Sequence, residues 1–195
     1  MQTCRQLDIT PGFLIRLAAA LLLLPLDWFF ALTFSALFHE ICHLLALRLL
    51  GGQARDIRLG AAGAVIQALP LPPGKGLICT LAGPLGSLLL LLSARWFPRL
   101  ALCTAVQAFW NLLPTGNSDG SHALEYWAAI FLPPRAALAL CRIIPRIMLI
   151  LISLAAVFSA WILKLGVLPV LAAGMLIIRG RNGKIPCKSQ PMRVQ

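Results

Sequence analysis

Long apolar segments, separated by short breaks rich in proline, glycine and charge, run through this chain of 195 residues. A helix over residues 28–50 would be about 34 Å long, enough to cross the hydrocarbon core of a bilayer. The pattern predicts an all-α polytopic membrane protein. About six transmembrane helices are expected, over residues 13–26, 28–50, 77–97, 100–132 with a break at 114–119, 143–163 and 165–178.

Residues 56–69 show a different pattern, in which apolar and small residues alternate loosely with polar ones and glycine is frequent. This weak alternation is typical of a strand or hairpin, although a plain glycine-rich loop fits it equally well. We therefore expect a short, membrane-associated strand or loop region after the second helix. The prolines and glycine at residues 70–74 end this region.

Composition supports the membrane assignment, because 59% of the residues are hydrophobic and only 12% are charged. Soluble domains are about half apolar and about a quarter charged. The length allows one transmembrane domain over residues 1–180, followed by a basic cytoplasmic tail over residues 181–195.

We attribute the net charge of +11 to the orientation of the protein in the membrane rather than to nucleic-acid binding. The basic residues stand between apolar segments without the interleaved aromatic residues of a strand-binding surface. With six spans and a cytoplasmic N-terminus, 13 of the 17 lysines and arginines fall on the cytoplasmic side and three on the other. Cytoplasmic loops collect such residues, so both termini are expected in the cytoplasm.

Two of the three histidines and one of the six acidic residues lie together as His39-Glu40-Ile41-Cys42-His43, inside the second apolar segment. A charge at the bilayer centre costs at least about 2.5–3.5 kcal/mol on insertion scales, which makes it a functional candidate. Residues at i and i+4 share a helix face, so both imidazoles can bind one metal ion while Glu40 reaches a water molecule as general base. The alternative, two histidines that only hydrogen-bond within a helix bundle, would be costly in an apolar span, and we favour zinc.

A catalytic zinc site of this kind has a third protein ligand and one position left for water. Outside the terminus and loops, the remaining candidates are Asp119, His122 and Glu125. Asp119 lies where an apolar helix breaks at Pro114 and restarts, and broken helices present groups to bound ligands in membrane proteins. We therefore expect His39, His43 and Asp119 to hold one zinc ion per chain.

These motifs resemble those of the site-2 protease family of intramembrane metalloproteases. The resemblance rests on HEICH at residues 39–43, Leu-Ala-Gly-Pro at residues 81–84 and Asn-Leu-Leu-Pro-x-x-x-x-Asp-Gly at residues 111–120. It is closest to the short bacterial type that processes a membrane-tethered sigma-factor precursor during sporulation. Cys42 departs from the family pattern, which often has glycine there.

The resemblance implies that residues 1–180 are a protease domain with His39, His43 and Asp119 as zinc ligands and Glu40 as the base. It also implies that Asn111 and the backbone near Pro114 hold an extended substrate, with residues 56–69 lining the cleft. An extended peptide added to such an edge would present its carbonyl for hydrolysis.

The expected partners are the lipid bilayer, a membrane-tethered protein or peptide substrate and a membrane regulatory protein, without nucleic acid. The expected location is a bacterial cell membrane, as a multi-pass protein. The main alternative is a zinc or proton-coupled transporter, which would need polar groups along a path across the membrane, whereas here they concentrate at one depth. An inactive family member acting as a chaperone would have no need of Glu40.

Overall fold

The computed structural model describes residues 6–60, 63–69, 71–116, 118–161 and 174. The chain divides into two compact units, Met1–Leu112 and Leu113–Gln195, and most of the described residues are helical, as predicted. The predicted helix over residues 165–178, apart from Gly174, and the tail over 181–195 lie outside the described residues.

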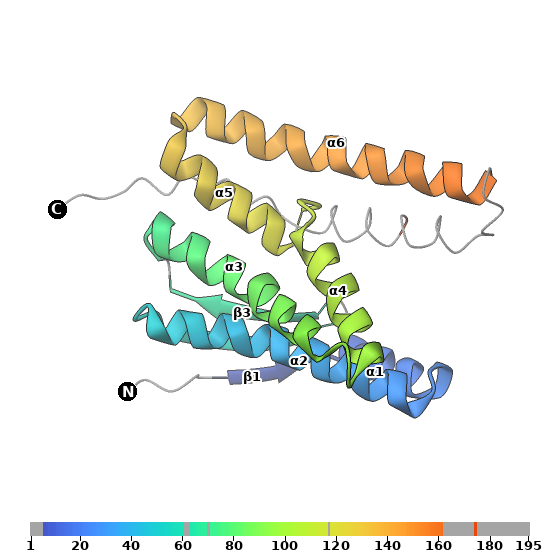
Figure 1. Cartoon of the computed structure of the whole chain (residues 1–195). Coiled ribbons are helices and arrows are strands. Elements are labelled where there is room, and N and C mark those ends of the chain that lie inside the picture. Colours follow the sequence, from blue (N-terminus) through green and yellow to red (C-terminus); the bar gives the residue numbers. More distant parts are fainter. Residues whose placement is uncertain (1–5, 61–62, 70, 117, 162–173, 175–195) are drawn as a thin grey trace. The chain divides into compact units, whose positions relative to one another are not determined.

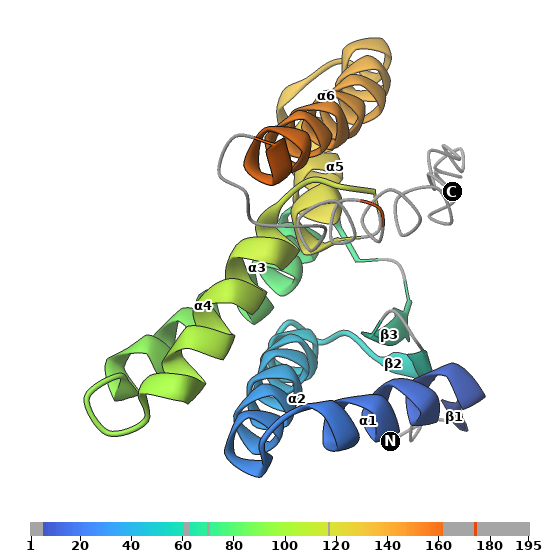
Figure 2. The same ribbon diagram turned by 90° about the vertical axis from the view of Figure 1, so that its right-hand side faces the viewer.

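Three helices of the first unit pack against one another and form its core (Figures 1 and 2). They are α2 (Leu26–Leu49), α3 (Pro73–Leu89) and α4 (Pro98–Leu112). A shorter helix, α1 (Pro11–Leu23), precedes α2, and a 3-10 turn, η1 (Leu90–Ser93), continues α3. Proline is the first residue of α1, α3 and α4. An N–H group at this position has no acceptor within the helix, so proline, which lacks it, costs no hydrogen bond there.

A three-stranded sheet completes the first unit, with strand order β1-β2-β3. The strands are β1 (Gln6–Ile9), β2 (Ala54–Gly60) and β3 (Gly63–Ala68), and β2 pairs with β1 in parallel and with β3 in antiparallel. Residues 56–69 are thus mainly strand rather than a plain loop. The sequence did not predict β1, whose four residues are too few for an alternating pattern. Parallel pairing needs a long crossover, and α1 and α2 supply it.

The second unit contains α5 (Asp119–Phe131) and α6 (Pro134–Trp161), which pack against each other. The predicted break at residues 114–119 is present, since α4 ends at Leu112 and α5 begins at Asp119. The predicted start of the next helix at residue 143 is wrong, because α6 begins nine residues earlier, at Pro134. Arginines in the first turns of α6 interrupt the apolar pattern, which made the predicted start too late. Arginine is nevertheless a good helix former, so the helix continues through them.

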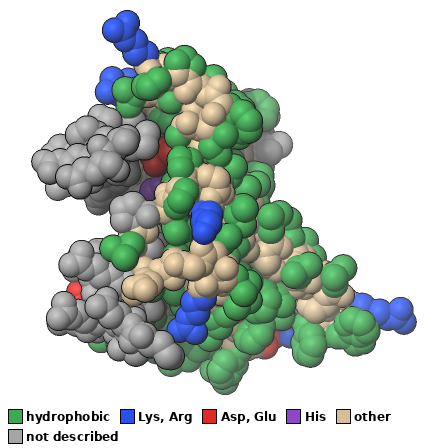
Figure 3. Space-filling model, turned by 90° about the vertical axis from the view of Figure 1, so that its left-hand side faces the viewer, with side chains coloured by type: hydrophobic (Ala, Val, Ile, Leu, Met, Phe, Trp, Pro, Cys, Tyr) green, Lys and Arg blue, Asp and Glu red, His purple; other side chains and the backbone are tan. Residues whose placement is uncertain are grey.

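Large apolar side chains point outward on the long helices, and the buried apolar residues are mostly alanine (Figure 3). Small residues at helix contacts and large ones outside are typical of helices packed in lipid. Among the described residues, Leu26–Leu49, Pro73–Ser93 and Pro134–Trp161 are long and apolar enough to cross a membrane. The count of six spans stays a prediction, because α1, α4 and α5 are shorter.

Candidate metal centre

The two histidines of the HEICH motif lie one turn apart on α2, on a face that contacts both α3 and α4. The side chain of His39 is 1% exposed, and His43 is half-buried. Their ring centroids are 4.8 Å apart and their planes are nearly perpendicular, at 82°. The i, i+4 spacing therefore brings the imidazoles together, as predicted.

A backbone carbonyl of α3 fixes the ring of His43. Its Nδ1 lies 2.9 Å from the carbonyl oxygen of Cys79. Because a carbonyl only accepts hydrogen bonds, Nδ1 carries the proton and donates it. In the neutral ring Nε2 is then unprotonated and has a lone pair available for a metal ion.

The ring of His39 is held from two helices. Its Nδ1 lies 2.9 Å from Oγ of Ser87 on α3, and its Nε2 lies 3.1 Å from Nδ2 of Asn111 on α4. With the Asn111 amide oriented in this way, its NH₂ group donates to Nε2, so Nε2 of His39 also carries a lone pair.

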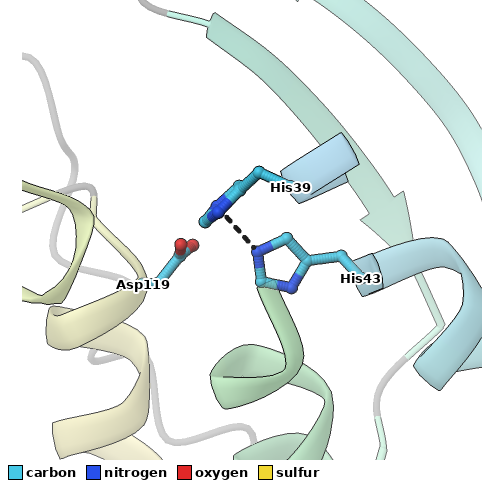
Figure 4. Close-up of side chains that lie close together, drawn as sticks. All are labelled: His39, His43 and Asp119. Carbon is cyan, nitrogen blue, oxygen red and sulfur yellow. Dashed lines mark hydrogen bonds between the residues drawn. The ribbon is translucent and has the colours of Figure 1, made fainter. Parts of the chain in front are cut away.

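The two Nε2 atoms face each other at 3.2 Å, along the dashed line in Figure 4. Two zinc–nitrogen bonds of about 2.0–2.1 Å at a tetrahedral angle would place two nitrogens roughly 3.4 Å apart. Two lone pairs at this distance repel unless a proton or a cation lies between them. The spacing and the donor atoms therefore fit a divalent metal ion.

Two glycines of α3 allow α2 to approach closely enough for these contacts. A Cβ atom added at Gly83 would lie 2.1 Å from Nε2 of His43, and one added at Gly86 would lie 2.3 Å from Sγ of Cys42. Both distances are far below van der Waals contact. Glycine is thus required at residue 83 if His43 is to keep its position.

A second group of buried polar side chains lies one turn away from His39 on α2. Oγ of Ser35 donates to Oε1 of Gln107 at 2.7 Å and accepts from Oγ1 of Thr104 at 3.1 Å. Ser35 and Thr104 are both fully buried. These bonds join α2 to α4, the helix that carries Asn111.

Within the second unit, Ser118 organises the break before α5. Its Oγ donates to the carbonyl of Leu113 at 2.6 Å and accepts the backbone N–H groups of Thr115 and Ser121, both at 3.3 Å. Gly116, with φ of 100°, donates its N–H to Oγ of Ser121 at 2.9 Å. The buried hydroxyls thereby hydrogen-bond backbone N–H and C=O groups that have no partner within the interrupted helix.

Asp119 is the first residue of α5 and is half-buried. A carboxylate is favourable there because the helix N-terminus carries partial positive charge. His39, His43 and Asp119 each offer one ligand atom, so the three residues could hold a metal ion (Figure 4).

The other predicted residues lie as follows. Glu40 is half-buried on α2 beside His39, and Pro114 is half-buried in the break. His122 and Glu125 contact each other, with Nδ1 and Oε2 3.4 Å apart. The sequence predicted no role for Ser87 or Cys79, although Leu-Ala-Gly-Pro at residues 81–84 marks the same helix.

No protein-family model matches the chain, and no curated protein matches it. Among solved structures, it is similar to the site-2 protease from Methanocaldococcus jannaschii, with a TM-score of 0.61 and 17% sequence identity. The similarity covers 94% of this chain and 92% of that one. This shows a shared fold, that of a helical membrane protein, in agreement with the fold that the resemblance implies.

Proposed function

We propose that this chain, which has the fold of a site-2 protease, is an intramembrane zinc metalloprotease that hydrolyses peptide bonds in membrane-embedded or membrane-tethered proteins. The observation that supports it most is the convergence of Nε2 of His39 and Nε2 of His43 at 3.2 Å, on a helix long and apolar enough to span a bilayer. Histidine pairs with this spacing around a glutamate are typical of zinc-dependent peptide hydrolysis.

In this proposal His39, His43 and Asp119 hold one zinc ion. When bound, zinc supplies Lewis acidity to a peptide carbonyl and to a water molecule. Glu40, next to His39 on α2, takes a proton from the attacking water and passes it to the leaving amine. The Nδ1 contacts to Ser87 and Cys79 keep the ring protons on Nδ1, so both Nε2 atoms can bind the metal once Asn111 no longer donates to Nε2 of His39.

Substrate binding is assigned to Asn111, the backbone near Pro114 and the sheet. Asn111 contacts His39 directly, so an extended peptide held by its amide would lie beside the metal ligands. Strand β2 is paired on both sides, which leaves β3 and β1 as the edges to which a further strand can add. An extended peptide exposes the bond to be cut, whereas a helix buries it in hydrogen bonds.

The finer assignment concerns biology. We propose a multi-pass protein of a bacterial cell membrane, with both termini in the cytoplasm, that processes a sigma-factor precursor during sporulation under the control of a membrane regulatory protein. The motifs at residues 39–43 and 111–120 support this through their resemblance to that type of enzyme.

The deciding experiment is co-expression with candidate membrane-tethered precursors, comparing wild type with Glu40→Gln. The amide keeps the shape of the side chain and leaves the three ligands, so zinc should stay while cleavage falls by about 10²–10⁴. Glu125→Gln is the matched control, because Glu125 is the chain's other glutamate and contacts His122. It should cleave normally.

Cleavage by Glu40→Gln at the wild-type rate would contradict the proposal. A zinc or proton-coupled transporter would then be the favoured function. Its path could include Ser35, Thr104 and Gln107, which extend the polar interior one turn beyond His39. Metal uptake by proteoliposomes, without cleavage of any tethered peptide, would establish it.

A further inference from the structure

Ser87 is a fully buried polar side chain near the C-terminal end of an apolar helix, α3. A buried hydroxyl is costly unless it is hydrogen-bonded. The bond that it makes goes to Nδ1 of His39, at 2.9 Å. Since His39 is itself 1% exposed, this contact is shielded from competing water.

The direction of this bond follows from the other side of the ring. A serine hydroxyl can donate or accept, but Asn111 donates to Nε2 of His39. Nε2 is therefore unprotonated, Nδ1 carries the proton, and Ser87 accepts it. Only an unprotonated imidazole nitrogen binds a metal ion.

The same helix orients both histidines. Ser87 holds His39, and the carbonyl of Cys79, eight residues earlier on α3, holds His43. Eight residues correspond to about 12 Å along a helix, so the two contacts are separate and each acts on its own ring.

We propose that Ser87 is a positioning residue that holds His39 in its Nδ1–H tautomer and aims Nε2 at the metal. This inference rests on the proposed function, because it assumes that His39 binds zinc. Partners that hydrogen-bond a metal-binding histidine typically contribute 10–100-fold to metal affinity. Ser87→Ala should therefore weaken zinc binding by about 10–100-fold without unfolding the chain.

The first measurement is the zinc dissociation constant of the purified full chain, by competition with a chromophoric chelator. Ser35→Ala is the matched control, since Ser35 is also a fully buried serine whose hydroxyl joins two helices, but its bonds go to Gln107 and Thr104. A zinc dissociation constant raised only in Ser87→Ala is the expected result. Equal weakening in both variants, or none in Ser87→Ala, would overturn the inference.

The second measurement reads the tautomer without any metal. The chain has three histidines, so the imidazole signals of ¹⁵N-histidine-labelled protein can be assigned with His→Gln variants. In the wild type, Nε2 of His39 should be unprotonated, and Ser87→Ala should shift this signal while leaving that of His43 in place. An unchanged His39 signal would refute the assignment.

The two proposals can fail separately. Unchanged zinc affinity and tautomer in Ser87→Ala would remove the role of Ser87 and leave the protease intact. The opposite outcome is a wild type that binds zinc but cleaves no tethered protein, together with weaker zinc binding in Ser87→Ala. It would remove the protease proposal and leave the role of Ser87 intact.

Discussion

Gly83→Ala tests the close approach of α3 to the metal ligands. The new Cβ would lie 2.1 Å from Nε2 of His43 and 2.6 and 2.7 Å from its two flanking carbons. Atoms of this kind make contact at about 3.5–4.0 Å, so the shortfall is roughly 1.4 Å. Because a Cβ is fixed to the backbone, either the ring must swing away or α3 must move.

Both responses disturb the metal site. A swing of the ring breaks its bond to the carbonyl of Cys79, and a shift of α3 also lengthens the bond between Ser87 and His39. Overpacking typically costs about 1–3 kcal/mol, which corresponds to a factor of about 5–150 in an equilibrium constant. We therefore expect zinc affinity to fall by about 5–150-fold.

The assay is elemental analysis of the purified variant, followed by chelator competition. Gly74→Ala is the control, because Gly74 lies on the same helix and an added Cβ there would meet nothing within 4 Å. The control should bind zinc as the wild type does. If Gly83→Ala keeps wild-type affinity, the packing of α3 against His43 described above is wrong.

Two further predictions concern the third ligand and the topology. Asp119→Ala should lose both zinc and cleavage, unlike Glu40→Gln, and full zinc content by elemental analysis would mean that another residue is the ligand. A reporter that works only in the cytoplasm should be active when it is fused to the C-terminus, since 13 basic residues are assigned to the cytoplasmic side. A reporter active only outside the cytoplasm would overturn the six-span prediction.

The histidine pair was predictable because its geometry is local. Once residues 28–50 are recognised as one helix, His39 and His43 must share a face. The break before Asp119 was also readable, since proline and glycine interrupt an apolar pattern there. These features depend on spacing along the chain and on nothing farther away.

The partners of the histidines were not predictable in the same way. Ser87, Cys79 and Gly83 reach His39 and His43 only because α3 presents one particular face to α2, and no local pattern fixes that rotation. Strand β1 was missed for a related reason, because its pairing partner β2 lies about 50 residues away. Long-range contacts of this kind select among faces that look alike in sequence.

The position of the histidines along α2 makes the site asymmetric across the bilayer. His43 is six residues from the C-terminal end of the helix, about 9 Å, and seventeen residues from its start, about 26 Å. Hydrolysis consumes one water molecule for each peptide bond cut. Water that enters from the Gly51 end of α2 has about a third of the distance to travel that water from the other end has. If the proposed protease activity holds, the nearer side would supply most of the water, and the six-span prediction assigns that side to the cytoplasm.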